Sequence, residues 1–344
     1  MMTEKEINIK YLYSLYPKLL DILLHDNTTK KNIIWATDYY KNKGFSYSAT
    51  GEIKPHHLNG KVRIIRPRIE KTKAEQAKRS KDNAEVFTPS WIVNKQNNLA
   101  DCAWFGKENV FNTENLDNSW TPTKKVVFDD NKTWVEYVEN IRLEVCCGEA
   151  PYLVSRYDTV SGELIKNNDR IGILDRKFRV INENVTTDEE WLDYAIKAIK
   201  SVYGYEFQGD NLLIARENIL LDFTDYYFER YNELPKEELL INVATIISWN
   251  IWQMDGIKNV VPFSCHSEIV KVIQLSLFDE FKEPKLDICP GCKTNDPKKH
   301  NGKRCYIMDW EKNKKIKFVS LMWRNNEYVG WEKEEWSSRG WREI

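Results

Sequence analysis

Three cysteines and one histidine toward the C-terminal end have the spacing of a metal site. Cys289 and Cys292 flank a Pro-Gly pair. His300 and Cys305 follow, which gives the pattern C-x2-C-x7-H-x4-C. Thiolate and imidazole ligands at such spacing suit tetrahedral zinc, and four protein ligands would make the site structural rather than catalytic. The alternative is a loop of unliganded thiols with an exposed histidine.

The cysteine count also bears on the compartment. Seven cysteines are an odd number, and the close pairs do not suit a disulfide framework, so we expect reduced or metal-bound thiols. The N-terminal residues are polar and do not form a signal peptide, which predicts a cytoplasmic protein. No apolar run approaches the roughly 18 residues of a membrane helix, so no membrane partner is expected. The remaining cysteines, Cys102, Cys146, Cys147 and Cys265, are interpreted as core residues.

A basic strip lies in the first quarter of the chain. Residues 1–100 carry 18 Lys and Arg against 10 Asp and Glu, and most of the excess falls between Lys61 and Lys81. Such a strip can neutralise phosphates and release condensed counterions, so we expect DNA as a partner. The alternative is a solvated helix face. The residues predicted to contact nucleic acid are Arg63, Arg66, Arg68, Lys71, Lys78 and Arg79.

The elements that must position these groups follow from the spacing of apolar residues. Residues 5–24 predict an amphipathic helix, and 1–80 form a helical and basic N-terminal region. From about 100 to 260, strand-like runs alternate with helical segments, which favours an α/β domain with a largely parallel sheet. Hydrophobic residues are 42% of the chain, so it can bury a core and is not a disordered polypeptide. Strands are expected at 141–145 and 202–207, and helices at 188–201, 211–223 and 239–250.

Three short motifs within this region occur in a particular order. Residues 84–92 read Ala-Glu-Val-Phe-Thr-Pro-Ser-Trp-Ile, residues 143–153 read Leu-Glu-Val-Cys-Cys-Gly-Glu-Ala-Pro-Tyr-Leu, and residues 202–206 read Val-Tyr-Gly-Tyr-Glu. Together they resemble the S-adenosylmethionine-dependent N6-adenine DNA methyltransferases, in particular the modification subunits of restriction systems. The resemblance covers roughly residues 80–260. It implies a Rossmann-like methyltransferase sheet with helices on both faces over 81–280, followed by a zinc-binding insertion and final strands over 281–344.

The resemblance also implies a set of cofactor-binding residues. A tight glycine turn after a strand lets the backbone approach a ligand at the carboxyl edge of an open sheet. A carboxylate at the end of the next strand can accept both ribose hydroxyls, for which Glu206 is the candidate and Asp175 a rival. Asp255, expected as the catalytic-site carboxylate, would accept from the adenine amino group. The alternatives are ordinary turns at Gly148 and Asp255 and a solvated strand end at Glu206. The residues expected to bind the cofactor are Phe87, Thr88, Pro89, Glu144, Cys147, Gly148 and Glu206.

The chain also departs from the family pattern. Ala150 stands where the family has a second glycine, and a side chain makes positive φ costly there. Glu149 adds a negative charge where the cofactor carboxylate would approach. The catalytic tetrapeptide Asn/Asp-Pro-Pro-Tyr/Phe, which holds and stacks on the flipped adenine, does not occur in the sequence. The apolar run at 316–322 could be the strand that normally leads to it.

Two functions remain open on these observations. The first is S-adenosylmethionine-dependent methylation of adenine N6 in DNA, within a restriction-modification or phage-related system. The second is a catalytically degenerate protein with a methyltransferase fold that binds nucleic acid or a partner subunit. Motif order favours the first, and the missing tetrapeptide favours the second.

Overall fold

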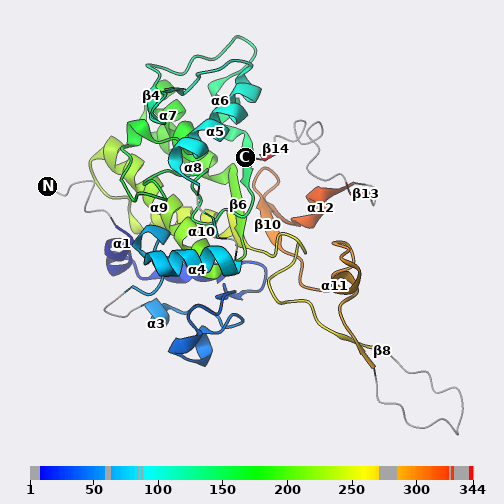
Figure 1. The fold of residues 1–344 in the computed structure, drawn as a ribbon. Coiled ribbons are helices and arrows are strands. Elements are labelled where there is room, and N and C mark those ends of the chain that lie inside the picture. Colours follow the sequence, from blue (N-terminus) through cyan, green and yellow to red (C-terminus); the bar gives the residue numbers. More distant parts are fainter. Residues whose placement is uncertain are drawn as a thin grey trace, which may run out of the picture.

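Four parallel strands form the sheet that positions the candidate site (Figure 1). Their order is β14-β5-β6-β7, so β6 lies between β5 and β7. Because the strands are parallel, their carboxyl ends meet at one edge, where α/β proteins place their ligands. The strands are β5 (Ile141–Glu144), β6 (Val202–Glu206), β7 (Ile251–Gln253) and β14 (Trp341–Glu343).

The computed structural model describes residues 8–58, 63–83, 85–86, 88–270, 285–324, 327–328 and 341–343. Besides the sheet, it contains short antiparallel pairs and a series of helices. The pairs are β1 (His25–Asp26) with β2 (Lys31–Asn32), β3 (Asn112–Glu114) with β4 (Trp120–Pro122), β8 (Glu268–Val270) with β9 (Lys285–Asp287), β10 (Tyr306–Asp309) with β11 (Lys314–Lys317), and β12 (Trp323–Arg324) with β13 (Glu327–Tyr328). The helices are α1 (Ile9–Leu15), α2 (Lys18–Leu24), α3 (Pro55–Leu58), α4 (Lys73–Asn83), α5 (Ser90–Phe105), α6 (Trp134–Glu139), α7 (Ile173–Asn184), α8 (Asp188–Lys200), α9 (Gly209–Tyr231), α10 (Glu237–Asn250), α11 (Pro290–Thr294) and α12 (Val319–Met322), with 3-10 turns at Lys41–Lys43, Phe45–Tyr47, Arg68–Glu70 and Asn167–Asp169.

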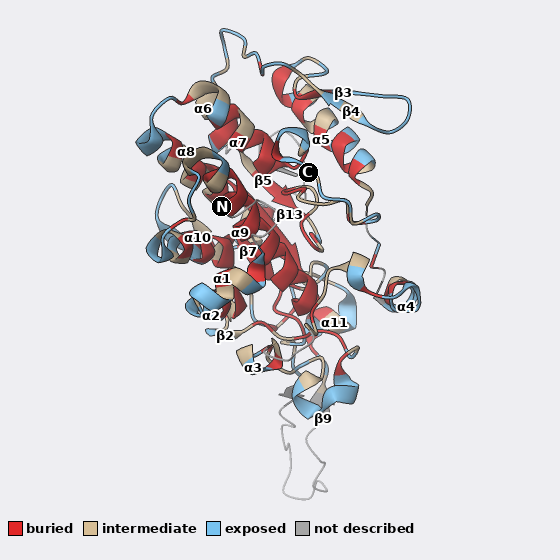
Figure 2. Cartoon of the chain, turned by 90° about the vertical axis from the view of Figure 1, so that its left-hand side faces the viewer, coloured by how far each residue is buried: buried red, intermediate tan, exposed pale blue. Residues whose placement is uncertain are grey.

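Helices α8, α9 and α10 cover one face of the sheet. Helix α9 is buried along most of its length, as Figure 2 shows. A helix buried on all sides must pair its polar side chains internally. Arg216, fully buried in α9, does so by donating to the backbone carbonyls of Leu23, His25, Ser248 and Ile251. The N-terminal segment is therefore hydrogen-bonded directly to the sheet domain.

The other face of the sheet differs from the expectation of helices on both faces. Among the described residues, it packs against the β10–β11 hairpin and the short helix α12. Tyr203, Tyr205 and Trp252 lie on this side, and the ring centroid of Phe318 is 4.9 Å from that of Trp252. The molecule is thus a mixed α/β structure with a small parallel sheet, in which a hairpin replaces the second helical layer.

The N-terminal region contains two helices rather than the single helix expected over 5–24. Helix α1 ends before Pro17, and α2 begins directly after it. Proline lacks an amide hydrogen and cannot continue a helix without losing a hydrogen bond, so the chain turns there. Leu12, Leu19 and Leu23 belong to the same apolar cluster as α9 and α10. The boundaries near 80 and 280 stay predictions.

Most of the expected elements are confirmed. The predicted strands at 141–145 and 202–207 are β5 and β6, and the three predicted helices are α8, α9 and α10. The strand expected over 316–322 is wrong, because β11 ends at Lys317 and residues Val319–Met322 form α12. The strand that pairs with β5 on the side away from β6 is β14. None of the helices in the described part of the chain has the length and hydropathy to span a bilayer.

Candidate functional site at the carboxyl edge of the sheet

The turn after β5 contacts the carboxylate at the end of β6. The Gly148 N–H donates to Oε2 of Glu206 over 2.9 Å, and the Gln208 N–H donates to Oε1 over 3.0 Å. The Cys147 N–H donates to the Tyr205 carbonyl, which fixes the turn against β6. Cys147, Gly148 and Glu206, predicted from the sequence to share a site, therefore lie together.

Burial controls the charge of this carboxylate. Desolvation raises the pKa of Glu206 from its usual value of 4.5 to about 7, although the N–H groups of Gln208 and Gly148 favour the ionised form. Glu144, at the end of β5, is also buried, and desolvation raises its pKa well above the usual range. Its Oε2 has no hydrogen-bond partner among the described residues. The edge thus offers two buried carboxylates, one with an unused acceptor.

The turn has an unusual backbone. Cys146, Gly148 and Ala150 have φ of 52°, 54° and 62° respectively. The side chain on Ala150 was expected to disfavour positive φ, yet the turn adopts it there. Cys146 and Ala150 carry side chains, so the left-handed conformation costs each of them roughly 1–2 kcal/mol of conformational free energy. Backbone strain of this kind is concentrated at functional sites.

Glycine at position 150 is expected to relieve this strain. The Ala150→Gly variant gains about 1–2 kcal/mol from the backbone and loses about 0.8 kcal/mol for one buried methyl, so it should be neutral or slightly stabilised. Ala215→Gly, at a buried position inside helix α9, should be destabilised by about 2 kcal/mol. Denaturant unfolding measures both. Equal destabilisation of the two variants would contradict strain at Ala150.

The space around Gly148 is open on one side. A Cβ atom placed on Gly148 would meet no described atom within 4 Å. The neighbouring Glu149 does not project into this space, because its carboxylate accepts hydrogen bonds from the Tyr157 hydroxyl (2.7 Å) and the Arg68 N–H (2.6 Å). The repulsion between Glu149 and a cofactor carboxylate, expected from the sequence, is thereby reduced.

The third carboxylate comes from the loop after β7. The Met254 N–H donates to the Glu206 carbonyl over 3.0 Å, so Asp255 follows directly beside β6. The Asp255 carboxylate accepts from the Ile257 and Lys258 N–H groups and lies 3.4 Å from the Lys258 ammonium. These contacts form a local turn. Asp255 therefore lies near the Gly148–Glu206 contact, with its oxygens partly occupied.

The remaining cofactor candidates lie on the segment before α5. Phe87 lies outside the described residues. The Thr88 carbonyl accepts from the Thr159 hydroxyl over 2.9 Å, and Pro89 is the residue at which α5 is capped. Asp175, the rival for the ribose role, lies in the first turn of α7 and not at a strand end. Its carboxylate accepts hydrogen bonds from the Ser155 and Gly172 N–H groups.

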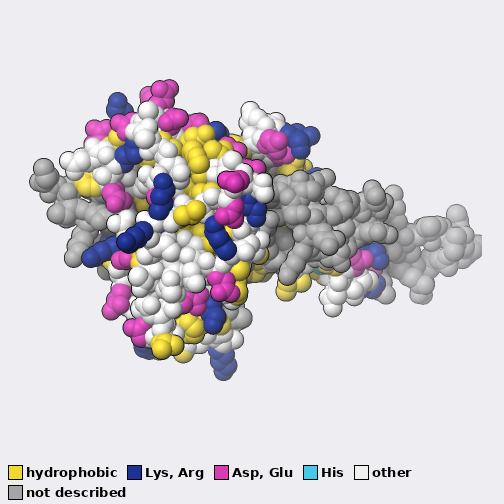
Figure 3. All heavy atoms as spheres, turned by 90° about the horizontal axis from the view of Figure 1, so that it is seen from above, with side chains coloured by type: hydrophobic (Ala, Val, Ile, Leu, Met, Phe, Trp, Pro, Cys, Tyr) yellow, Lys and Arg dark blue, Asp and Glu magenta, His cyan; other side chains and the backbone are white. Residues whose placement is uncertain are grey.

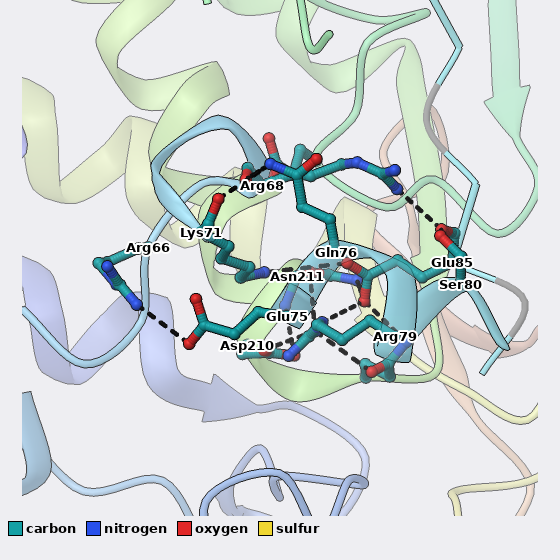
Figure 4. Close-up of polar contacts among 12 residues, drawn as sticks. Arg66, Arg68, Lys71, Glu75, Gln76, Arg79, Ser80, Glu85, Asp210 and Asn211 are labelled. Atoms are coloured by element: carbon teal, nitrogen blue, oxygen red, sulfur yellow. Dashed lines mark hydrogen bonds and ion pairs between the residues drawn. The ribbon is translucent and has the colours of Figure 1, made fainter. Parts of the chain in front are cut away.

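Part of the predicted nucleic-acid strip is buried beside this site (Figure 4). Arg79, on α4, donates to Glu85 over 2.7 Å and pairs with Asp210 at the start of α9 over 2.7 Å. Burial raises the pKa of Asp210, but the charges of Arg79 and Lys71 and the hydrogen bonds from Tyr40 and Arg79 together lower it below its usual value. The Tyr40 hydroxyl also donates to Asp210. Arg79 thus fastens α4 to the N-terminal end of α9.

Lys71 lies in the same buried cluster. Its ammonium is 3.9 Å from Oε1 of Glu85, and neither of these two atoms has a hydrogen-bond partner among the described residues. Four buried carboxyl groups surround Lys71 and Arg79 and outnumber these two cations. They belong to Glu85, Glu149, Glu206 and Asp210, and burial raises the pKa of Glu149 and of Glu206. A positively charged ligand would favour the ionised forms of these two groups.

The prediction of phosphate contacts is therefore corrected for Lys71 and Arg79, because a buried side chain in an ion pair cannot reach a polyanion. Arg63 pairs with the buried Glu217, and Arg68 donates to the Glu85 carbonyl. Arg66 pairs with Glu75. Lys78 is exposed and lies over the Tyr39 ring. On the face seen in Figure 3, Lys and Arg side chains are interspersed with Asp and Glu.

A second cluster has the chemistry of a metal site. The Sγ atoms of Cys265, Cys289 and Cys292 lie 3.6, 3.7 and 3.6 Å from Nδ1 of His300, and all four ligand atoms lie within 4.8 Å of one another. Metal–sulfur and metal–nitrogen bonds of about 2.3 and 2.0–2.1 Å at tetrahedral angles would separate S and N by about 3.6 Å. The four residues could therefore hold one metal ion.

The fourth predicted ligand, Cys305, is wrong and Cys265 takes its place. Cys305 precedes β10 and is buried against the sheet, with its sulfur 3.4 Å from the Gln253 carbonyl. Cys265 lies 24 positions before Cys289, on the loop that follows β7, so short-range spacing could not find it. The cluster joins this loop to the 289–300 segment.

Glycines make the close approach of the ligands possible. A Cβ on Gly291 would lie 2.6 Å from Cγ of His300, and one on Gly302 would lie 3.1 Å from the Cys265 sulfur. The Asn301 N–H donates to the Cys289 sulfur over 3.3 Å. Although burial raises the pKa of Cys289, this and other N–H donors lower it to about 6, which favours the metal-binding thiolate.

Comparison with known proteins does not place the chain in a family. The chain matches no family model, no curated protein and no solved structure. The function of the chain can therefore be inferred only from the residues at the carboxyl edge of the sheet and in the Cys-His cluster.

Proposed function

We propose that the chain binds S-adenosylmethionine at the carboxyl edge of β5, β6 and β7, as a methyltransferase-like protein with a Rossmann-like sheet. The observation that carries this proposal is the contact between the Gly148 N–H and the buried Glu206 carboxylate, next to open space. A glycine turn and an acidic strand end in this relation are what a ribosyl ligand requires of an open parallel sheet.

The surrounding residues fit the other parts of such a ligand. Glu206 would accept from the ribose hydroxyls, and Asp255 would accept from the adenine amino group. The unused Oε2 of Glu144 would accept from the methionine ammonium. The sulfonium and ammonium groups outweigh the single carboxylate of S-adenosylmethionine, and this net positive charge suits the excess of buried carboxylates.

The bound cofactor would supply an electrophilic methyl group. The motif order favours adenine N6 in DNA as the acceptor, and the roles of this chain's residues would be to bind and orient the cofactor. The alternative is a catalytically degenerate protein that binds nucleic acid or a partner subunit. The absence of an Asn-Pro-Pro-Tyr segment favours a protein without methyltransferase activity. The ion pairs of Arg63, Arg66, Lys71 and Arg79 involve four of the nine basic residues of the strip, which favours a partner subunit over nucleic acid as the ligand.

For the second cluster we propose zinc, in a structural role. Three thiolates and one imidazole form a closed, soft ligand set, which selects zinc over harder cations. Zinc here would fix the loop after β7 relative to the segment that leads into β10. It would lie outside the methyl-transfer chemistry.

Calorimetric titration with S-adenosylhomocysteine tests the main proposal. We expect saturable binding with one site per chain. An assay with radiolabelled S-adenosylmethionine and adenine-containing DNA then separates the two functions: label in N6-methyladenine supports the enzyme, and binding without label supports the degenerate protein. The absence of binding by either cofactor form would refute the proposal.

A further inference from the structure

An exposed phenylalanine lies in a strained conformation beside the metal cluster. Phe263 is 54% exposed and has a φ of 58°. A bulky residue in the left-handed region is an outlier that persists only where its surroundings enforce it, and such outliers are concentrated at binding sites. An exposed aromatic ring gains nothing from this strain in the free protein. Neighbouring groups must therefore hold Phe263 in this conformation, and its ring is available to contact a ligand.

The restraint comes from the metal cluster and its neighbours. Cys265, one of the four ligands, lies two residues after Phe263. The intervening Ser264 accepts from the Lys303 N–H over 2.9 Å, and the Val261 N–H donates to the Lys303 carbonyl over 2.8 Å. Phe263 thus lies between the metal-ligating Cys265 on its C-terminal side and the Val261–Lys303 backbone hydrogen bond on its N-terminal side.

The Phe263 ring contacts the residue that follows Glu206 in the chain. It packs edge-to-face against Phe207, with ring centroids 5.7 Å apart. Phe207 follows Glu206 directly in the sequence, and its carbonyl accepts from the Gln253 amide over 2.9 Å. Phe207 is thus one residue from the carboxylate assigned to the ribose, and Phe263 lies on the same loop as Asp255.

We propose that Phe207 and Phe263 form the stacking wall for the purine ring of the adenosyl ligand, and that the metal ion holds Phe263 in place. This inference rests on the proposed function. A purine offers a flat π-face to aromatic side chains, and its polar groups would lie toward Glu206 and Asp255. Because Cys265 and Phe263 share one short loop, metal binding and nucleoside binding are coupled, and by linkage each strengthens the other.

The experiment compares S-adenosylhomocysteine affinity, measured by calorimetry, with and without the metal. The metal-loaded wild type is compared with Phe263→Ala, Phe263→Tyr and, as a matched control, Phe45→Ala, which removes a 94% exposed ring elsewhere. We expect Phe263→Ala to bind roughly tenfold more weakly, in the range of base–aromatic stacking, while Phe263→Tyr and Phe45→Ala bind as the wild type does.

Metal removal completes the test. Treatment with a zinc chelator is expected to weaken binding by the wild type about as much as Phe263→Ala does, and to have little further effect on that variant. Binding by Phe263→Ala equal to that of the wild type would overturn the inference and leave the proposed function standing. A metal effect of equal size in both proteins would overturn the coupling through Phe263. No binding by the metal-loaded wild type would refute both the inference and the proposed function.

Discussion

Replacing Cys265 with alanine is expected to abolish stoichiometric metal binding, whereas replacing Cys305 with alanine is expected to preserve it. The reason is geometric, because the Cys265 sulfur lies with His300, Cys289 and Cys292 while the Cys305 sulfur contacts the Gln253 carbonyl. Loss of one of four ligands should weaken zinc binding on the order of 100-fold or more. Elemental analysis after dialysis against a competing chelator measures the metal content of each variant.

Stability provides the second measurement for the same pair of variants. Metal binding stabilises the folded form by mass action, so chelator should lower the melting temperature of the wild type and of Cys305→Ala. The Cys265→Ala variant should melt at the same temperature with or without chelator. One metal ion per chain in Cys265→Ala, together with metal loss in Cys305→Ala, would restore the ligand set expected from the sequence and refute the one found in the structure.

Replacing Glu206 with glutamine is expected to stabilise the fold and weaken ligand binding. Burial raises the pKa of Glu206 to about 7 in the folded protein, from 4.5. A carboxyl whose pKa is raised on folding contributes stability below pH 4.5, and that stability is lost as pH rises through 7. At pH 8 the wild type therefore carries an ionisation cost of up to about 3 kcal/mol, which glutamine avoids.

The two effects of this variant can be measured separately. Denaturant unfolding should show Glu206→Gln more stable than the wild type at pH 8, by about 1–3 kcal/mol, and nearly equal to it at pH 5. Affinity for S-adenosylhomocysteine should fall about tenfold or more, because the charge-assisted bonds from the ribose hydroxyls are lost. A variant that is less stable at pH 8 and binds as tightly as the wild type would show that Glu206 is a structural residue.

Several parts of the fold could be predicted because their signals are local. Residues 202–206 combine β-branched and aromatic residues and precede a long helical pattern, and they form β6 as expected. The turn at Gly148 follows a strand-like run at 141–145, and the contact with Glu206 could be anticipated because adjacent parallel strands end at one edge. Cys289 and Cys292 were identified by a short spacing that the structure preserves.

The parts that could not be predicted depend on contacts between distant residues. The basic strip suggested a solvent-facing surface, but Arg79 pairs with Asp210, 131 positions away, and becomes buried. Nothing in the local sequence marks that partner. Cys265 lies 24 positions before Cys289, so its participation depends on where the loop after β7 lies. The run at 316–322 has strand-like composition, yet packing against the sheet makes its second half helical.

The most direct test of the central claim is a crystal structure of the chain with S-adenosylhomocysteine bound. We expect electron density for the nucleoside beside Gly148, with both ribose hydroxyls about 3 Å from the Glu206 carboxylate. The purine ring should lie against Phe207 and Phe263. Density for the ligand elsewhere in the molecule, or side chains that fill the space next to Gly148, would contradict the assignment.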